Sequence, residues 1–236
     1  WCLCNFRKIM RITFISDTHT KHHEVTDDLP GGDLLIHAGD IMNSGRDRYD
    51  IENYCEWFDD IDNYDHKIFI AGNHDRMFED NPRKAMEIVN SYKSIDYLQD
   101  DWIEVGNDES MAKIYGSPWQ PAFCNWAFNL PRNGKELQEK WDQIPNKVDI
   151  LVCHTMPFGH LDATGNLNVG CELLRVKSDE LRPKIFVGGH IHSGAGYKFD
   201  GHTHFFNASV LNNSYRYVNK PMTVDWDKET NEITFI

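Results

Sequence analysis

The sequence predicts an α/β fold in which two mixed β-sheets pack together and helices flank them, an αββα sandwich. Three observations predict it: five short apolar runs have the composition of buried strands, helical patterns lie between strands, and hairpin-like strands follow later in the chain. With 236 residues, 40% of them hydrophobic, the chain is long enough for one buried core and short for two independent domains. We therefore expect a single domain over residues 10–236.

Five apolar runs predict the central strands. Each is too short for a helix and rich in β-branched or aromatic residues, which is typical of a strand with both faces buried. The runs are Ile12–Ile15, Leu34–Ile36, Ile68–Ile70, Ile150–Val152 and Ile185–Val187. Met10, just before the first run, has the position of a natural start. We therefore expect residues 1–9 to be an N-terminal extension or a remnant of cloning.

Helical periodicity predicts the elements between the strands. Apolar residues recur at helical spacing from Asp50 to Ile61, and this helix would connect two strands as a βαβ crossover. A second helix is expected to begin with Asn81 as N-cap and Pro82 at its first position. The remaining predicted helices are Lys135–Trp141 and Gly170–Leu181.

The other expected strands are antiparallel, and a turn around residues 228–231 joins the last two. These strands are Trp102–Val105, Lys113–Tyr115, Thr203–Asn207, Met222–Trp226 and Ile233–Ile236.

The charge balance restricts the partners. Asp and Glu number 37 against 24 Lys and Arg, so the formal net charge is −13. Such a surface repels a long polyanion, which argues against extended nucleic acid as a partner. No apolar run approaches the roughly 18 residues that cross a bilayer, and no leader resembles a signal peptide. We therefore expect a cytoplasmic protein with no membrane partner.

Residue types that bind metals follow each of the five apolar runs. The loops read Asp17-Thr-His19, Gly39-Asp40, Gly72-Asn-His-Asp75, His154 and Gly189-His-Ile-His192. In open α/β sheets, the loops beyond the carboxyl ends of the strands converge on one crevice. Carboxylate and imidazole together suit zinc, manganese or iron, and one carboxylate can bridge two ions. The set therefore predicts two divalent cations, whose identity stays open.

Each motif taken alone has a simpler explanation. Gly-Asp is a common turn, and a histidine at a strand end is usually a hydrogen-bonded core residue. His37, inside a predicted strand, fits that structural role better than the role of a ligand. The ordered recurrence at five strand ends is what indicates metal binding.

The ordered pattern D-x-H, G-D, G-N-H-D, a lone strand-end His and G-H-x-H closely resembles the calcineurin-like metallophosphoesterase family, from Arg11 onward. The resemblance implies the ligands of each cation. They are Asp17, His19, Asp40 and His192 for the first cation, and Asp40, Asn73, His154 and His190 for the second. Asp40 would be the bridge. The family usually has Gly before the lone His, where this chain has Cys153, a change that leaves the ligand in place.

The resemblance also implies a hydrolytic mechanism. Two cations roughly 3.5–4 Å apart make a bridging hydroxide a nucleophile at neutral pH, and it attacks phosphorus in line. His74, next to the ligand Asn73, would protonate the leaving oxygen. Asp75 is expected to orient the His74 ring, with a cap of the next turn as the alternative role.

Four segments further resemble the metallophosphoesterase-domain-containing subgroup that hydrolyses cyclic nucleotides. They are Tyr115–Trp119, Asn125–Arg132, Asn168–Leu174 and Asn207–Ser209. The resemblance implies a phosphodiesterase whose substrate is a small phosphodiester, a cyclic nucleotide, that contacts Asn73 and His74. Both a 2′,3′ and a 3′,5′ ring are compatible with these residues.

The aromatic residues among these segments have two interpretations. Trp119, Phe123 and Trp126 would stack on the base, while Asn125 or Asn129 reads its edge. Alternatively the aromatic cluster only packs a long loop over the sheet, which is the favoured interpretation for Phe123 and Phe128.

Two rival functions would use the same residues. A phosphomonoesterase or protein phosphatase would hold the same cations in a more open cleft, and a catalytically weak scaffold protein would keep the fold alone. Because every ligand and His74 are present, the sequence favours an enzyme.

Overall fold

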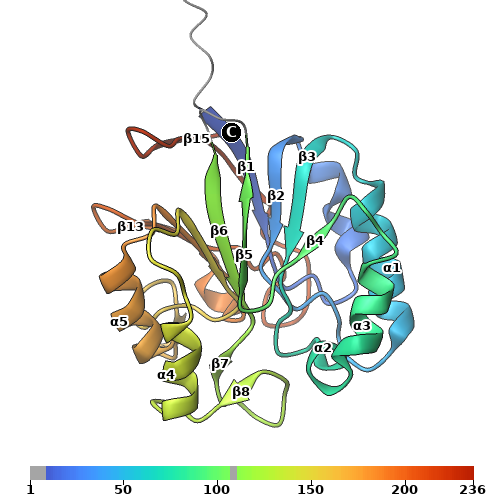
Figure 1. Cartoon of the computed structure of the whole chain (residues 1–236), viewed down its shortest axis with the longest axis horizontal. Coiled ribbons are helices and arrows are strands. Elements are labelled where there is room, and N and C mark those ends of the chain that lie inside the picture. Colours follow the sequence, from blue (N-terminus) through green and yellow to red (C-terminus); the bar gives the residue numbers. More distant parts are fainter. Residues whose placement is uncertain (1–8, 107–110) are drawn as a thin grey trace, which may run out of the picture.

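The computed structural model describes residues 9–106 and 111–236 (Figure 1). Two six-stranded mixed sheets pack together, and helices cover their outer surfaces. This architecture confirms the predicted fold class. Of the expected extension over residues 1–9, only Ile9 lies within the described residues, where it opens the first strand.

The first sheet has the strand order β16-β15-β1-β2-β3-β4. Its strands are β1 (Ile9–Ile15), β2 (Gly32–His37), β3 (Tyr64–Phe69), β4 (Asp96–Tyr97), β15 (Met222–Asp227) and β16 (Glu232–Phe235). Strands β1 to β4 run parallel, β15 pairs antiparallel with β1, and β16 pairs antiparallel with β15. Ile36 of β2 pairs with Phe14 of β1 and with Ile68 of β3, so apolar side chains form a continuous row.

The second sheet has the order β13-β14-β12-β9-β6-β5. Its strands are β5 (Asp101–Val105), β6 (Ala112–Ser117), β9 (Ile150–Cys153), β12 (Ile185–Gly188), β13 (Gly196–Phe199) and β14 (His204–Asn207). Two short ladders lie outside the sheets. They are β7 (Gln120–Pro121) with β8 (Asn129–Leu130), and β10 (Ala163–Thr164) with β11 (Leu167–Asn168).

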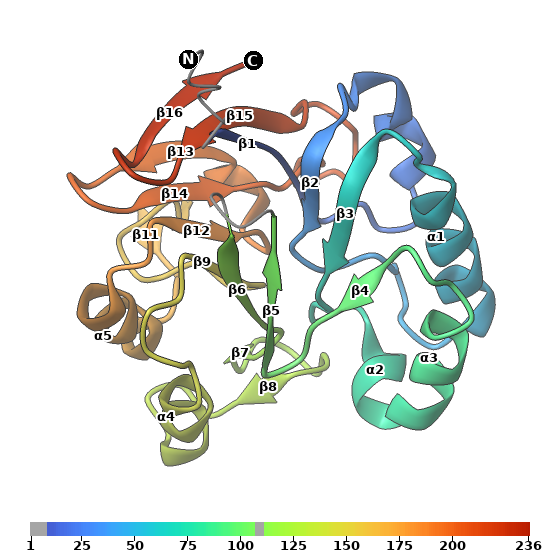
Figure 2. The ribbon, with the colours of Figure 1, turned by 45° about the horizontal axis from the view of Figure 1, so that its top comes forward.

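Helices cover the outer face of each sheet, as Figures 1 and 2 show. On the first sheet lie η1 (His22–Asp28), α1 (Arg48–Asp60), α2 (Arg76–Asp80) and α3 (Pro82–Val89). On the second lie α4 (Lys135–Asp142) and α5 (Glu172–Leu181), and a short 3-10 turn, η2 (His192–Gly194), follows β12. In the described ranges no helix is long and apolar enough to cross a bilayer.

The core has three parts. One cluster lies between the sheets and includes Phe14 and Ile150, and the other two lie under the helices, around Phe58 of α1 and Trp141 of α4. Successive residues of a strand point to opposite faces, so the central strands are buried on both faces. This explains why they read as uninterrupted apolar runs rather than as alternating patterns.

Two of the strands predicted to be antiparallel pair in parallel with one of their two neighbours. The strand predicted at Lys113–Tyr115 is β6, which pairs parallel with β9, and the strand predicted at Thr203–Asn207 is β14, which pairs parallel with β12. Only β5 and β13 pair with them antiparallel. The chain crosses over through α4 between β6 and β9, and it doubles back through β13 before β14, so both strands return in the direction of their neighbours.

Helix α5 begins at Glu172, two residues after the predicted start at Gly170. Cys171 is its N-cap, and the Leu174 N–H donates to the Cys171 Sγ at 3.3 Å. Asn81 occupies the N-cap position of α3 as predicted, but within the described part of the chain its side chain makes no capping hydrogen bond.

Candidate metal centre

The loops that follow β1, β2, β3, β9 and β12 bring the predicted ligands together. Their ligand atoms form three overlapping groups, and within a group all ligand atoms lie within 4.8 Å of one another. The groups are Asp17, His19 and His192; His19, Asp40 and His74; and Asp40, His154 and His190. Asn73 adjoins the third group, since its Oδ1 lies 3.1 Å from Nε2 of His154. We call the seven predicted ligands the ligand cluster.

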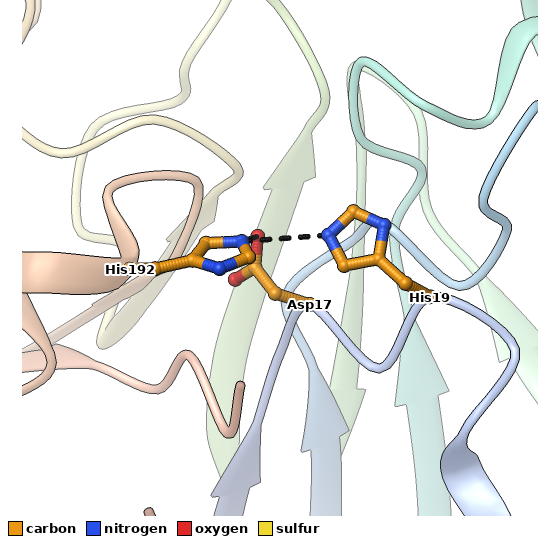
Figure 3. Close-up of side chains that lie close together, drawn as sticks. All are labelled: Asp17, His19 and His192. Carbon is orange, nitrogen blue, oxygen red and sulfur yellow. Dashed lines mark hydrogen bonds and ion pairs between the residues drawn. The ribbon is translucent and has the colours of Figure 1, made fainter. Parts of the chain in front are cut away.

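Figure 3 shows the first group. Asp17 follows β1, His19 lies two residues further on, and His192 begins η2. Nε2 of His192 lies 3.3 Å from Oδ1 of Asp17 and 3.4 Å from Nε2 of His19. Three potential ligand atoms, from elements far apart in the sequence, therefore face one another.

Asp40 stands between the two predicted cation sets. Its Oδ2 lies 3.7 Å from Nε2 of His19, in the first set, and 3.4 Å from Nε2 of His154, in the second. Its Oδ1 instead accepts the backbone N–H of His74 at 2.7 Å. One oxygen is thus fixed by the backbone while the other faces both sets, which is the arrangement that a bridging carboxylate needs.

Backbone carbonyl groups orient the imidazoles. A carbonyl oxygen only accepts, so each histidine Nδ1 that meets one carries the hydrogen and turns Nε2 toward the cluster. The acceptors are the carbonyl oxygens of Met42 for His19 (3.0 Å), Ala38 for His154 (2.9 Å) and Asn212 for His192 (3.0 Å). Burial lowers the pKa of His19 to about 4, so at neutral pH its Nε2 carries a free lone pair, directed at Nε2 of His192. The donor set of imidazole and carboxylate fits zinc, manganese or iron.

The electrostatics of the ligand cluster favour positive charge. Burial lowers the pKa of His154 and of His192, but the carboxylates of Asp40 and Asp17 outweigh it and raise both values to about 9. Conversely, burial raises the pKa of Asp17 and Asp40, while the facing imidazoles hold both below their usual range. Both carboxylates are therefore ionised at neutral pH and attract cations.

Backbone strain is concentrated in the ligand cluster. Four of the seven ligands are non-glycine residues in the left-handed region, which L-residues rarely adopt. They are Asp17 (φ 56°), His19 (φ 42°), Asp40 (φ 58°) and His190 (φ 66°). Strained residues of this kind persist where the surrounding structure enforces them, commonly at functional sites.

Glycines allow the loops to approach the cluster closely. A Cβ atom at Gly72 would collide with the side chain of Asp40, and one at Gly189 would collide with the side chain of Asp17. Any larger residue at either position would displace a ligand, which explains why Gly precedes Asn73 and His190.

His74 lies beside the ligand cluster, but Asp75 does not orient it. The Nδ1–H of His74 donates to the carbonyl oxygen of Asn43 at 2.6 Å. The Asp75 carboxylate accepts three backbone N–H groups instead, those of Gly72 (2.7 Å), Met42 (2.8 Å) and Ile41 (3.2 Å). The expected contact between Asp75 and the His74 ring is therefore corrected: Asp75 joins the Asp40 and Asn73 loops. Asp75 does occupy the N-cap position of α2, but within the described residues its side chain makes no capping hydrogen bond, so the alternative role as a cap is wrong as well.

The two tryptophans have different surroundings. Trp126 stacks on His74, with ring centroids 4.0 Å apart and an interplanar angle of 25°. Trp119 lies elsewhere, because its indole N–H donates to Asp100 at 2.8 Å and Lys140 lies over its ring. The structure thus links Trp126 to the site and gives Trp119 a packing role.

The expected reading of a base edge by Asn129 is not supported, whereas the same expectation for Asn125 stays a prediction. The Asn129 amide donates to the carbonyl oxygens of Phe123 (3.0 Å) and Cys124 (3.1 Å), and its Oδ1 accepts from Gln120 (3.0 Å). Asn129 therefore holds its own loop together.

A cavity of about 260 Å³ lies over the ligand cluster. Its lining consists of Asp40, Asn73, His74, Phe123, His190, His192, Asn213 and Tyr215. The sequence analysis considered Phe123 for stacking but favoured packing, and it did not consider Asn213 or Tyr215. For Phe123 the signal was its place between two segments already singled out, Tyr115–Trp119 and Asn125–Arg132, whereas the turn around Tyr215 carries no recognisable motif.

Comparison with known proteins shows the family. The family model for calcineurin-like phosphoesterases matches residues 10–194. The chain is 38% identical over 234 residues to human metallophosphoesterase domain-containing protein 1, an alignment covering 91% of this chain and 70% of that protein.

Solved structures of low identity share the fold. The protein TT1561 of Thermus thermophilus aligns with a TM-score of 0.65 at 12% identity, over 97% of this chain and 98% of that one. Phosphopantetheinyl hydrolase of Mycobacterium tuberculosis aligns with a TM-score of 0.56 at 15% identity, over 86% and 90%. Together with the family model and the human relative, the ligand cluster shows that the chain belongs to the calcineurin-like phosphoesterase family, in which a dinuclear metal centre serves the hydrolysis of phosphoric esters.

Proposed function

We propose that this chain is a phosphodiesterase that opens small cyclic phosphodiesters, with cyclic nucleotides as its substrate class. The observation that carries the proposal is the position of His74. Its Nδ1–H is held by the Asn43 carbonyl and its ring lies against Trp126, while it shares a group of ligand atoms with His19 and Asp40. A proton donor is thus fixed beside the cavity.

The ligand cluster would hold two divalent cations, with Asp17, His19 and His192 on one side of Asp40 and Asn73, His154 and His190 on the other. When bound, the cations supply Lewis-acid polarisation of the phosphoryl group and a water of lowered pKa as the nucleophile. Asn73 adds a neutral amide oxygen, which limits the negative charge beside the phosphate of the substrate.

His74 would complete the reaction at its Nε2. As the bond between phosphorus and the leaving oxygen breaks, the oxygen takes the proton from Nε2, and the carbonyl of Asn43 retains the Nδ1 hydrogen. In a cyclic diester the leaving hydroxyl stays attached to the product, so this one proton transfer finishes the opening of the ring.

The size of the cavity supports a small substrate. A volume of about 260 Å³ is slightly below the roughly 300–1,000 Å³ typical of ligand pockets, and a net charge of −13 disfavours a long polyanion. A compact phosphodiester fits both properties.

The proposal is tested with metal-loaded wild type and His74→Ala on a panel of 2′,3′- and 3′,5′-cyclic nucleotides, with bis-p-nitrophenyl phosphate and p-nitrophenyl phosphate beside them. We expect diester preference in wild type, and a loss of kcat on the order of 10²–10⁴-fold in His74→Ala. His202→Ala is the control, because the His202 ring forms a hydrogen bond with the Arg182 carbonyl and does not line the cavity. Preference for the monoester would favour a phosphatase, and no turnover by a protein that binds two cations would favour a scaffold.

A further inference from the structure

Two aromatic side chains stand at the cavity beside opposite parts of the ligand cluster. Phe123 packs edge-on against His190, with ring centroids 5.7 Å apart, and Tyr215 packs edge-on against His19 at 4.7 Å. His190 belongs to the second predicted cation set and His19 to the first. We call Phe123 and Tyr215, which both line the cavity, the aromatic rim.

Both residues remain exposed despite these contacts, so packing accounts for only part of their apolar surface. Phe123 is 55% exposed and Tyr215 is 38% exposed, whereas Phe128, five residues after Phe123, is fully buried. Apolar surface left in water forgoes about 25 cal/mol per Å². Exposed rings beside a polar cavity are typical of a ligand site, where the ligand supplies the missing burial.

The Phe123 loop is held in place before any ligand binds. The Asn129 side chain accepts the Phe123 N–H at 3.3 Å and donates to the Phe123 carbonyl at 3.0 Å. Arg76 donates to the Asn125 carbonyl at 2.5 Å, and the Ala127 N–H donates to the Asn73 carbonyl at 3.0 Å. These contacts fix the loop to the segment that carries Asn73.

The turn that carries Tyr215 is fixed as well. The Asn212 side chain accepts the N–H groups of Ser214 (2.9 Å) and Arg216 (3.1 Å), and the Asn212 carbonyl accepts the Tyr215 N–H at 2.8 Å. Tyr215 has φ 56°, an unfavourable conformation for an aromatic residue. The same carbonyl also orients His192. The turn therefore joins the aromatic rim to the ligand cluster and holds a strained residue at the cavity.

We propose that the aromatic rim is a subsite for the nucleobase of the substrate, with the phosphodiester over the ligand cluster. This inference rests on the proposed function, since only a substrate that carries a base would use the subsite. Because both loops are fixed in advance, binding orders few additional side-chain torsions. Stacking uses the π-face that every base has, so the subsite selects for a base without discriminating strongly among bases.

The test compares two substrates with the same cyclic phosphate ring: a cyclic nucleotide, and an analogue with a methoxy group in place of the base. Phe123→Leu and Tyr215→Leu should each raise KM for the nucleotide about tenfold and lower the kcat/KM ratio of nucleotide to analogue by a similar factor. Tyr215→Phe keeps the ring and should keep the ratio. Phe199→Leu is the matched control, an exposed phenylalanine in β13 that does not line the cavity.

A second measurement does not depend on turnover. Calorimetry of manganese-loaded protein should show a lower dissociation constant for adenosine monophosphate than for inorganic phosphate. The ratio of the two dissociation constants should move about tenfold toward one in either leucine variant. If the variants keep both the substrate ratio and the binding difference, the subsite is overturned while the proposed function stands. If wild type opens no cyclic nucleotide at all, the proposed function falls and the subsite with it.

Discussion

The ligand cluster and the aromatic rim serve the same cavity but are built in different ways. The ligands stand at the ends of strands buried on both faces, and backbone carbonyl groups orient their side chains. The rim residues are exposed and lie on irregular loops that asparagine side chains hold together. Under the proposed function, the packed sheets would position the metal ligands, and the loops would position the residues that contact the base. Changes in the cluster should remove activity, whereas changes in the rim should alter selectivity.

Asp40→Ala should have the largest effect. Oδ2 of Asp40 faces both His19 and His154, so the substitution removes a ligand from both cation sets. We expect kcat to fall on the order of 10³-fold or more, because stabilisation of the transition state by two cations is worth several kcal/mol. Steady-state kinetics and metal content after gel filtration measure the two effects.

His192→Ala is the matched comparison, because His192 belongs to the first set only. This variant should lose one cation and retain the other. Equal loss of both cations in the two variants would contradict the bridging position of Asp40.

Ser209→Ala tests a support behind the ligand cluster. The Ser209 hydroxyl donates to Oδ2 of Asp17 at 2.8 Å, and both groups are buried. Loss of such a contact typically weakens metal affinity by about 10–100-fold. Calorimetric titration of metal-free protein with manganese should show this loss at one of two sites. Ser193→Ala is the control, since the exposed Ser193 hydroxyl donates to the Ala163 carbonyl; equal affinities in the two variants would show that Asp17 does not depend on Ser209.

Trp126→Ala and Trp119→Ala should separate positioning from packing, with the smallest effect on activity. Trp126 stacks on His74, and aromatic pairs are worth about 0.5–1.5 kcal/mol, so kcat should fall roughly three- to tenfold with little change in KM. The Trp119 indole N–H donates a hydrogen bond to Asp100, so Trp119→Ala should lower the melting temperature and leave kcat near that of wild type. The reverse pattern, measured by kinetics and thermal melting, would contradict the separation.

The ligand cluster could be predicted because its signal is local. Asp40 and His154 each combine a metal-binding residue type with a position within a few residues of the end of an apolar strand, and both features are visible in the sequence. The groups that orient the imidazoles could not be predicted. His19 depends on the carbonyl of Met42, and every residue has a carbonyl, so side-chain identity carries no information about it.

The remaining errors concern long-range contacts. The sequence of β6 indicates a strand but not whether β9 will lie beside it in parallel, because the crossover between them decides the direction. Likewise, the position of the Trp119 ring depends on Asp100, which lies 19 residues before Trp119 and accepts its indole N–H. Loop conformation of this kind has no periodic signature.

The most direct test of the account is crystallography of the manganese-loaded protein with anomalous scattering. We expect two anomalous peaks, one on each side of Asp40. One would lie among Asp17, His19, Asp40 and His192, and the other among Asp40, Asn73, His154 and His190. A single peak, or peaks that do not contact Asp40, would contradict the two-cation centre on which the proposed function depends.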